Sequence, residues 1–159
     1  MQVIFLYYSK QMKDILKNKP RRSDCPIANT LDIFGDRWSL LIIRDMMFLD
    51  KREFGELITN NEKIATNILS DRLQRLQDAG IILKSSDPSN GTKYIYTLTE
   101  RGIQFLPAMI EVILWGMKNI PNTAMPKRFL QAMEFDREAF EKSVTANLEE
   151  KLMLEMMLL

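Results

Sequence analysis

In the stretch Ile64-Ala-Thr-Asn-Ile-Leu-Ser-Asp-Arg-Leu-Gln-Arg-Leu-Gln-Asp-Ala-Gly80, large apolar residues recur at helical spacing. They are Leu69, Leu73 and Leu76, with Ile64 and Ile68 beside them. This spacing predicts a helix over residues 65–79 that buries one apolar stripe and leaves its other face free for a partner. Gly80 is expected to end the helix, at the position that commonly adopts a positive φ.

The segments on either side of this helix indicate a complete motif. Downstream, two strand-like runs cover residues 81–85 and 93–98, and the turn residues Asp87-Pro-Ser-Asn-Gly91 separate them. Upstream, a short helix over Arg52 to Ile58 and a polar turn at residues 59–61 are expected. Helix, turn, helix and hairpin in this order predict a mainly α fold with a small β-hairpin wing, a winged helix-turn-helix whose second helix enters the major groove of DNA.

Side chains suited to DNA recognition follow from this arrangement. The free face of the helix carries short hydrogen-bonding groups for base edges, namely Thr66, Asn67, Ser70 and Gln74. Phosphate contacts are expected from Arg52, Arg72 and Arg75, and wing contacts to the minor groove from Asn90 and Lys93. Leucines at helical spacing are usually only core, so the hairpin and the polar first turn of the helix carry the DNA-binding prediction.

Charge adds little to this prediction. Residues 51 to 102 hold eight Lys or Arg against seven Asp or Glu, which is not the basic face of a strong phosphate binder. Affinity is therefore expected to rest on the placement of the contacts and on dimerisation.

Several separated motifs agree with one family in order and spacing. They are Cys25-Pro-Ile-Ala-Asn-Thr-Leu-Asp-Ile-Phe-Gly-Asp-Arg-Trp-Ser-Leu-Leu-Ile-Ile-Arg44, Phe54-Gly-Glu-Leu57, Leu69-Ser-Asp-Arg-Leu73, Tyr96-Thr-Leu-Thr-Glu-Arg-Gly102, Pro107 and Trp115-Gly116. Over roughly residues 24 to 118 the chain resembles the HxlR family. That resemblance implies a small dimeric winged-helix transcriptional regulator, related in architecture to MarR proteins.

The chain departs from the family pattern at three places. Asp36 precedes Arg37-Trp38 where a Gly is common, and Glu53 precedes Phe54 where the family often has Arg, so that Arg52 is the substitute phosphate contact. Ala65 stands where a Ser or Thr would cap the recognition helix, a loss of about 1 kcal/mol, and Thr66 is the alternative cap. Base preference therefore does not transfer from relatives.

Composition bounds the function class. A chain of 159 residues with 46% hydrophobic residues supports one domain of ordinary size with a full core. The sequence has no histidine and one cysteine, which argues against an enzyme, a metal site or a cofactor. The longest apolar runs fall short of a membrane helix, and the first residues lack the basic leader of a secretion signal, so a cytoplasmic protein without membrane contact is expected.

Two segments flank the expected domain of residues 24–119. Residues 1–23 form a basic arm, which is either a solvated tail or lies near DNA phosphates, and Met12 is an alternative start of translation. Residues 120–159 form a helical extension, with helices expected over Lys127 to Phe135 and after Asp136. Because the tail is apolar and rich in methionine, it is expected to be buried on a partner subunit, or less favourably to line a ligand pocket.

Cys25 is a candidate redox sensor. Arg21, Arg22 and a following Pro26 at a helix start favour a thiolate, whereas Asp24 opposes it, and a lone cysteine is most often a buried small hydrophobe. The resemblance implies that an oxidant, or a small-molecule electrophile, is the effector, because some members of the family sense such compounds with a cysteine at this position.

A dimerisation helix is expected from Thr99 to Met117. Apolar residues recur along it at spacings of three and four, namely Ile103, Leu106, Ile110, Ile113, Leu114 and Met117. Pro107 is expected to bend this helix without stopping it. Two earlier helices, over residues 27–33 and 38–48, are expected to supply core residues: Leu31, Phe34, Trp38, Leu41 and Ile42.

These patterns favour a homodimer that binds double-stranded promoter DNA and represses transcription. The alternative from another class is a protein-interaction module, a winged helix that has lost DNA binding and uses its tail to hold a helix of another protein.

Overall fold

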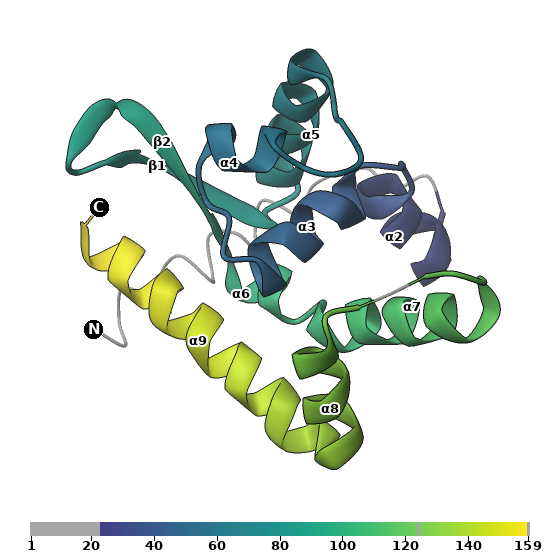
Figure 1. Ribbon diagram of the computed structural model, residues 1–159. Helices are drawn as coiled ribbons and strands as arrows, with labels where there is room; N and C mark the ends of the chain where they lie inside the picture. The colour runs from purple at the N-terminus through teal and green to yellow at the C-terminus, as the bar shows by residue number, and fades with distance from the viewer. Residues whose placement is uncertain (1–22, 124, 159) are drawn as a thin grey trace.

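The computed structural model describes residues 23–123 and 125–158. Within them the elements follow in the order α2 (Pro26–Phe34), α3 (Ser39–Phe48), α4 (Phe54–Ile58), α5 (Thr66–Asp78), β1 (Ile82–Asp87), β2 (Asn90–Leu98), α6 (Glu100–Ile103), α7 (Leu106–Asn119), α8 (Lys127–Phe135) and α9 (Arg137–Leu158). The described part is mostly helical, with β1 and β2 paired as an antiparallel hairpin (Figure 1). The predicted mainly α fold with a β-hairpin wing is confirmed.

Helix α5 has the orientation that its leucines predict. Leu69, Leu73 and Leu76 are all almost completely buried. At its end Gly80 has φ 67°, and the Gly80 and Ile81 amides donate to the carbonyls of Gln77 and Leu76, which is a Schellman motif. At its start Ala65 is the N-cap and makes no side-chain cap bond. Thr66 is the first helical residue, so the expectation that it caps the helix is wrong.

The wing is longer than predicted, and its turn lies within the predicted turn segment of residues 87–91. β1 and β2 pair from Ile82 with Leu98 to Asp87 with Asn90, which leaves Pro88 and Ser89 as the turn. The Asp87 carboxylate accepts hydrogen bonds from the amide and the hydroxyl of Ser89, and Pro88 supplies the fixed φ of a turn. The Asn-Gly pair that was expected to turn the chain therefore lies at the start of β2.

The helix expected from Thr99 to Met117 is two helices. α6 ends at Ile103 and α7 begins at Leu106, with a tight turn in which the Phe105 amide donates to the Gly102 carbonyl. Pro107 lies in the first turn of α7, where its missing N–H costs nothing, and its ring would clash with a helix continued from α6. The prediction of one bent helix is wrong for this reason.

Helix α2 packs less deeply than predicted. Phe34 is buried at its end and stacks on Phe105 with ring centroids 4.2 Å apart. Ile42 is buried as expected, and Trp38 packs half-buried against the core. Leu31 is 57% exposed, so its expected place in the core is wrong; it lies on the outer side of α2 with Ile27.

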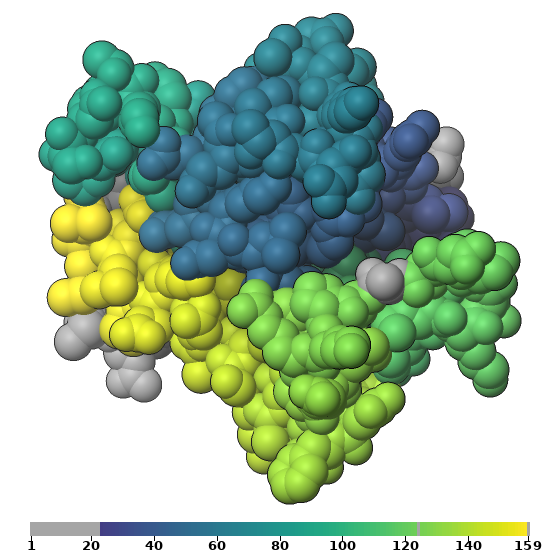
Figure 2. Space-filling model, viewed as in Figure 1, coloured from purple at the N-terminus to yellow at the C-terminus, as the bar shows by residue number. Residues whose placement is uncertain are grey.

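The C-terminal extension packs on its own chain. α9 contacts α3, α6, α7, α8 and β2, and buries Phe140, Leu148 and Leu152. The prediction that the extension packs on a partner subunit is therefore wrong for the face of α9 that carries these three residues. In Figure 2 the end of α9 lies directly beneath the wing. The expectation that the apolar tail is buried is wrong for part of its last two turns, where four apolar residues are exposed: Met153, Leu154, Met157 and Leu158.

The arm predicted over residues 1–23 lies, apart from Ser23, outside the described residues.

Candidate nucleic-acid interface

The outer face of α5 carries the four predicted base-reading side chains. Thr66, Asn67, Ser70 and Gln74 are all exposed, on the side of the helix opposite to the buried leucines. The Gln74 amide donates to the Asp78 carboxylate at 2.8 Å, one turn further along the same face. Such short polar groups on a protruding helix match the hydrogen-bonding pattern of base edges in a major groove.

The two arginines of α5 differ in their surroundings. Arg75 is exposed and pairs with Asp71 at 3.0 Å, whereas the side chain of Arg72 is only 20% exposed and pairs with Asp71 at 3.1 Å and with Asp36 at 3.3 Å. Arg75 is therefore free to move to a phosphate at little cost, because exposed ion pairs contribute about 0–1 kcal/mol. Arg72 instead links α5 to the start of α3.

Asp36 has a structural role that the sequence analysis did not foresee. Its carboxylate accepts hydrogen bonds from the Trp38 amide at 2.8 Å, from the Ser39 amide at 3.0 Å and from the Ser39 hydroxyl. Burial alone would raise the pKa of Asp36, but these hydrogen bonds and the charge of Arg72 outweigh it and hold the pKa below its usual value. The acid that departs from the family pattern thus caps α3 and anchors α5.

Lys93 and Asn90 lie on the wing as predicted. The Lys93 ammonium is half-exposed and pairs with the Glu53 carboxylate at 2.7 Å, and that hydrogen bond raises the pKa of Lys93. Asn90 is exposed near the turn, and its side-chain oxygen accepts from the Thr92 hydroxyl at 2.7 Å. Glu53, the other departure from the family pattern, is therefore the residue that joins the wing to the start of α4.

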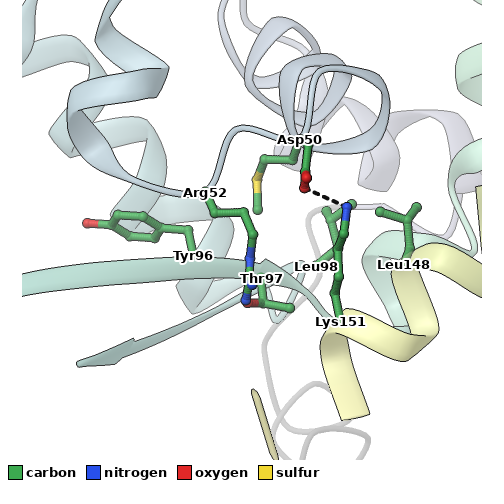
Figure 3. Close-up of a pocket in the computed structure, with 8 residues that line it drawn as sticks. Asp50, Arg52, Tyr96, Thr97, Leu98, Leu148 and Lys151 are labelled. Carbon is green, nitrogen blue, oxygen red and sulfur yellow. Dashed lines mark hydrogen bonds and ion pairs between the residues drawn. The ribbon is translucent and has the colours of Figure 1, made fainter. Parts of the chain in front are cut away.

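Arg52 does not face the same side as these residues. Its guanidinium Nη2 donates to the Glu155 carboxylate at 2.7 Å and to the Thr97 hydroxyl at 2.5 Å, which places it between the wing and α9. Figure 3 shows Arg52 pointing to Thr97, with Asp50 and Lys151 paired beside them. The predicted phosphate contact would require this internal ion pair to break.

A charged network positions the turn before α5. Arg44 pairs with Glu62 at 2.7 Å and with the buried Asp45 at 2.6 Å, while Lys51 pairs with Asp45 at 3.0 Å and donates to the Thr59 carbonyl. Hydrogen bonding to Arg44 holds the pKa of Glu62 below its usual value. The sequence does not indicate which charged residues pair in this network, because its members lie up to 18 positions apart along the chain.

Cys25 is exposed, at the N-cap of α2 and directly before Pro26. Its amide donates to the Ser23 hydroxyl at 3.0 Å, and its carbonyl accepts from the Asn29 side chain at 2.8 Å. The alternative of a buried small hydrophobe is wrong, because the thiol lies at the surface.

The predicted dimerisation residues divide into two groups. Ile103, Leu106 and Ile110 are at most 4% exposed within one chain, so they are core residues and a second chain cannot reach them. Ile113, Leu114 and Met117 are half-buried. The exposed large apolar side chains of α2 and α7 are instead Ile27, Leu31, Val112 and Trp115, with Ile120 at the end of α7.

Two cavities lie away from this interface. The space beside Arg52 and Lys151 holds only about 10 Å³, less than a small molecule needs, so the junction with α9 is closely packed. An open cleft of about 240 Å³ lies between α2 and α6, lined partly by Phe34, Arg101 and Phe105, and is smaller than most ligand pockets. Over the described residues, none of the helices is long and apolar enough to cross a membrane.

A short helix, a turn, a protruding helix with a polar outer face, and an antiparallel wing define a winged helix-turn-helix protein. The model of the HxlR-like helix-turn-helix family matches residues 33–124, more than half of the sequence. The chain belongs to this family.

Relatives and solved structures agree with this membership. A protein of Mycobacterium bovis named an uncharacterized HTH-type transcriptional regulator is 32% identical over 63% of this chain, and the match spans 62% of that relative's length. A MarR-family structure from Porphyromonas gingivalis has TM-score 0.54 and 32% identity, and covers 65% of this chain and 100% of its own. The redox regulator HypR in its oxidized form has TM-score 0.53 and 28% identity, and covers 60% of this chain and 97% of its own.

Proposed function

We propose that the protein is a homodimeric, sequence-specific DNA-binding transcriptional regulator that represses by competing for promoter DNA. We propose no catalytic role for the protein. Because its target is chromosomal DNA, we expect the protein in the cytoplasm. One observation carries it: α5 buries its whole leucine stripe and turns Thr66, Asn67, Ser70 and Gln74 outward. In helix-turn-helix proteins the second helix of the motif lies in the major groove, where side chains of this kind contact base edges.

The near-neutral charge is compatible with this role. Lys93 and Arg75 pair with Glu53 and Asp71 in partly exposed ion pairs, which exchange easily for a phosphate. Arg52 pairs with Glu155 of α9, away from the outer face of α5, so we exclude it from the proposed contacts. Arg72 is also enclosed, but it lies on α5 itself and we keep it as a flanking contact. Few phosphates are neutralised by one chain, and two chains are therefore needed for useful affinity.

The exposed apolar side chains of α2 and α7 support dimerisation. Trp115 is 64% exposed and Ile27 is 69% exposed, and together with Leu31, Val112 and Ile120 they give these two helices several exposed apolar side chains that a second chain would cover. In helix-turn-helix dimers the two recognition helices lie about 34 Å apart, one turn of duplex, and we expect the same spacing for the two α5 helices of this dimer.

The dimer is tested by sedimentation of Trp115→Glu. We expect this variant to be monomeric and the unaltered chain to be dimeric at the same concentration. Phe135→Glu is the control, because Phe135 is an even more exposed aromatic residue, at 93%, and lies on α8, outside α2 and α7. Dimers of both variants would reject the α2 and α7 face.

DNA binding is tested by fluorescence anisotropy with two duplexes, one from the region upstream of the gene and one of random sequence, over a range of salt. We expect tighter binding to the first and a linear fall of log K with log[salt] for both. A flat salt response would favour the alternative, a protein-interaction module without DNA binding. That alternative is supported by the ion pairs that four basic residues make with acids of the same chain: Arg52, Arg72, Arg75 and Lys93.

We propose that oxidants act through Cys25. The thiol is exposed at a helix start, and a structural relative, HypR, is named a redox regulator. Because the sequence has one cysteine, oxidation of a dimer by diamide should join two chains, visible at twice the monomer mass on a non-reducing gel. DNA affinity should fall, and Cys25→Ser should abolish both effects; a thiol that reacts only after denaturation would end this proposal.

A further inference from the structure

The end of α9 places a carboxylate under the wing. The Glu155 side chain is buried and accepts hydrogen bonds from Arg52 Nη2 at 2.7 Å and from the Ser85 hydroxyl of β1. Arg52 in turn donates to the Thr97 hydroxyl of β2 at 2.5 Å. One residue of the extension thus contacts β1 directly and is linked to β2 through Arg52.

This cluster lies at the base of the wing. Contacts at the base set the orientation of the whole hairpin. Ser85 and Thr97 are buried, whereas the hairpin beyond them, with Ser89 and Asn90, is exposed. The Arg52 carbonyl also accepts from the Tyr96 amide at 2.8 Å, so the segment before α4 runs along β2. A small change of angle at this base would move the exposed end of the wing by much more.

A second contact holds α9 beside the first. Lys151, one turn before Glu155, pairs with Asp50 at 2.5 Å, and Figure 3 shows this pair next to Arg52 and Thr97. Leu148 and Leu152 are buried on the same side of the helix. Position 155 is therefore held both along and around the axis of α9.

Stability alone does not account for the choice of residues. A buried ion pair costs desolvation that apolar side chains of similar volume avoid, and here Arg52 Nε is buried without a hydrogen-bond partner. Polar partners, unlike leucines, hold the groups that they join in one defined arrangement.

We infer that Glu155 is a positioning residue for DNA recognition: through Ser85 and Arg52 it fixes the wing relative to α5. The DNA contacts of the wing then depend on a residue of α9, beyond residues 33–124 of the family match. This inference rests on the proposed function for its effect on DNA, but the fixed wing can be measured without DNA.

The first test is hydrogen exchange of the full chain without DNA. In Glu155→Ala we expect the amides of β1 and β2 to exchange about tenfold faster, while those of α5 keep their protection. Glu150→Ala is the matched control, an exposed carboxylate on the same helix, and should change nothing. Unchanged exchange in β1 and β2, or an equal loss in α5, would overturn the inference; Glu155→Gln replaces the Ala variant if that one does not fold.

The second test is a double-mutant cycle in DNA binding to the upstream duplex. Lys93→Ala alone should reduce the salt slope by about one unit, and in the Glu155→Ala background it should change it no further, because the wing has already lost its position. Additive effects would overturn the inference. If the unaltered chain binds no DNA, the proposed function fails and the exchange experiment alone decides the role of Glu155.

Discussion

Helices α5 and α9 both bury leucines and expose most of their polar side chains, yet α9 also turns one carboxylate inward. α5 keeps its hydrogen-bonding groups outside, where the side chains of Asn67 and Ser70 have no hydrogen-bond partner among the described residues. α9 turns Glu155 inward, between Arg52 and Ser85, and leaves Met153 and Leu154 exposed. This contrast agrees with the proposed function: α5 would contact DNA, whereas α9 packs against the rest of its own chain.

The largest expected effect contrasts a buried leucine of α5 with an exposed leucine of α9. Leu69→Ala on α5 should reduce the free energy of unfolding by about 2–5 kcal/mol, because Leu69 is fully buried and the cavity cannot close. Leu154→Ala on α9 should cost less than about 0.5 kcal/mol, since that side chain is 56% exposed. Urea denaturation followed by circular dichroism measures both, and similar losses would show that the two helices are equally packed.

The next effect concerns the outer face of α5. Asn67→Ala and Ser70→Ala should each reduce the discrimination between upstream and random DNA by about 1–3 kcal/mol and leave the salt slope unchanged. Competition binding at constant salt measures the discrimination. Equal losses on the two DNAs would mean that these side chains do not read bases.

A smaller effect is expected at the wing. Lys93→Ala should weaken binding to every sequence equally, because a phosphate contact carries no sequence information. Glu53→Gln is the informative partner variant: it removes the negative charge that pairs with Lys93 and should strengthen binding to both DNAs. Binding constants measured on both duplexes would contradict this placement if Lys93→Ala changed only one of them.

The smallest effect is on acid stability. The pKa values of Asp36 and Glu62 lie below their usual 3.8 and 4.5, so both groups stabilise the folded chain above those values and lose this contribution as the pH falls through the lowered pKa. The midpoint temperature of thermal unfolding should therefore be constant near neutral pH and should decrease below about pH 4. Asp36→Asn keeps a cap acceptor without the charge and should flatten the fall; an identical profile would reject this cause.

The fold was predictable wherever a local pattern decides it. The leucines of α5, Gly80 and the alternating strands of the wing each specify their structure within a few residues. The break before Pro107 was missed because the apolar spacing continues across it, and Leu31 was misplaced because helical spacing does not say which side the core covers.

The candidate site was predictable in type but not in pairing. The polar residues of α5 are where the pattern put them. The inward turn of Arg52 depends on Glu155, and the position of Arg72 depends on Asp36. A sequence pattern cannot reveal such pairs, because their members are far apart along the chain and any surface acid would be an equal candidate.

The junction under the wing also has a consequence for the order in which the chain folds. Arg52 and Glu155 are separated by 103 positions and Ser85 and Glu155 by 70, so their contacts close long loops, whereas the hairpin and α5 form from neighbours. Closing such loops costs entropy that is recovered only after most of the chain has collapsed, so α9 should dock last and detach first. Helix α9 would then open as a cooperative unit of its own while the leucines of α5 stay packed.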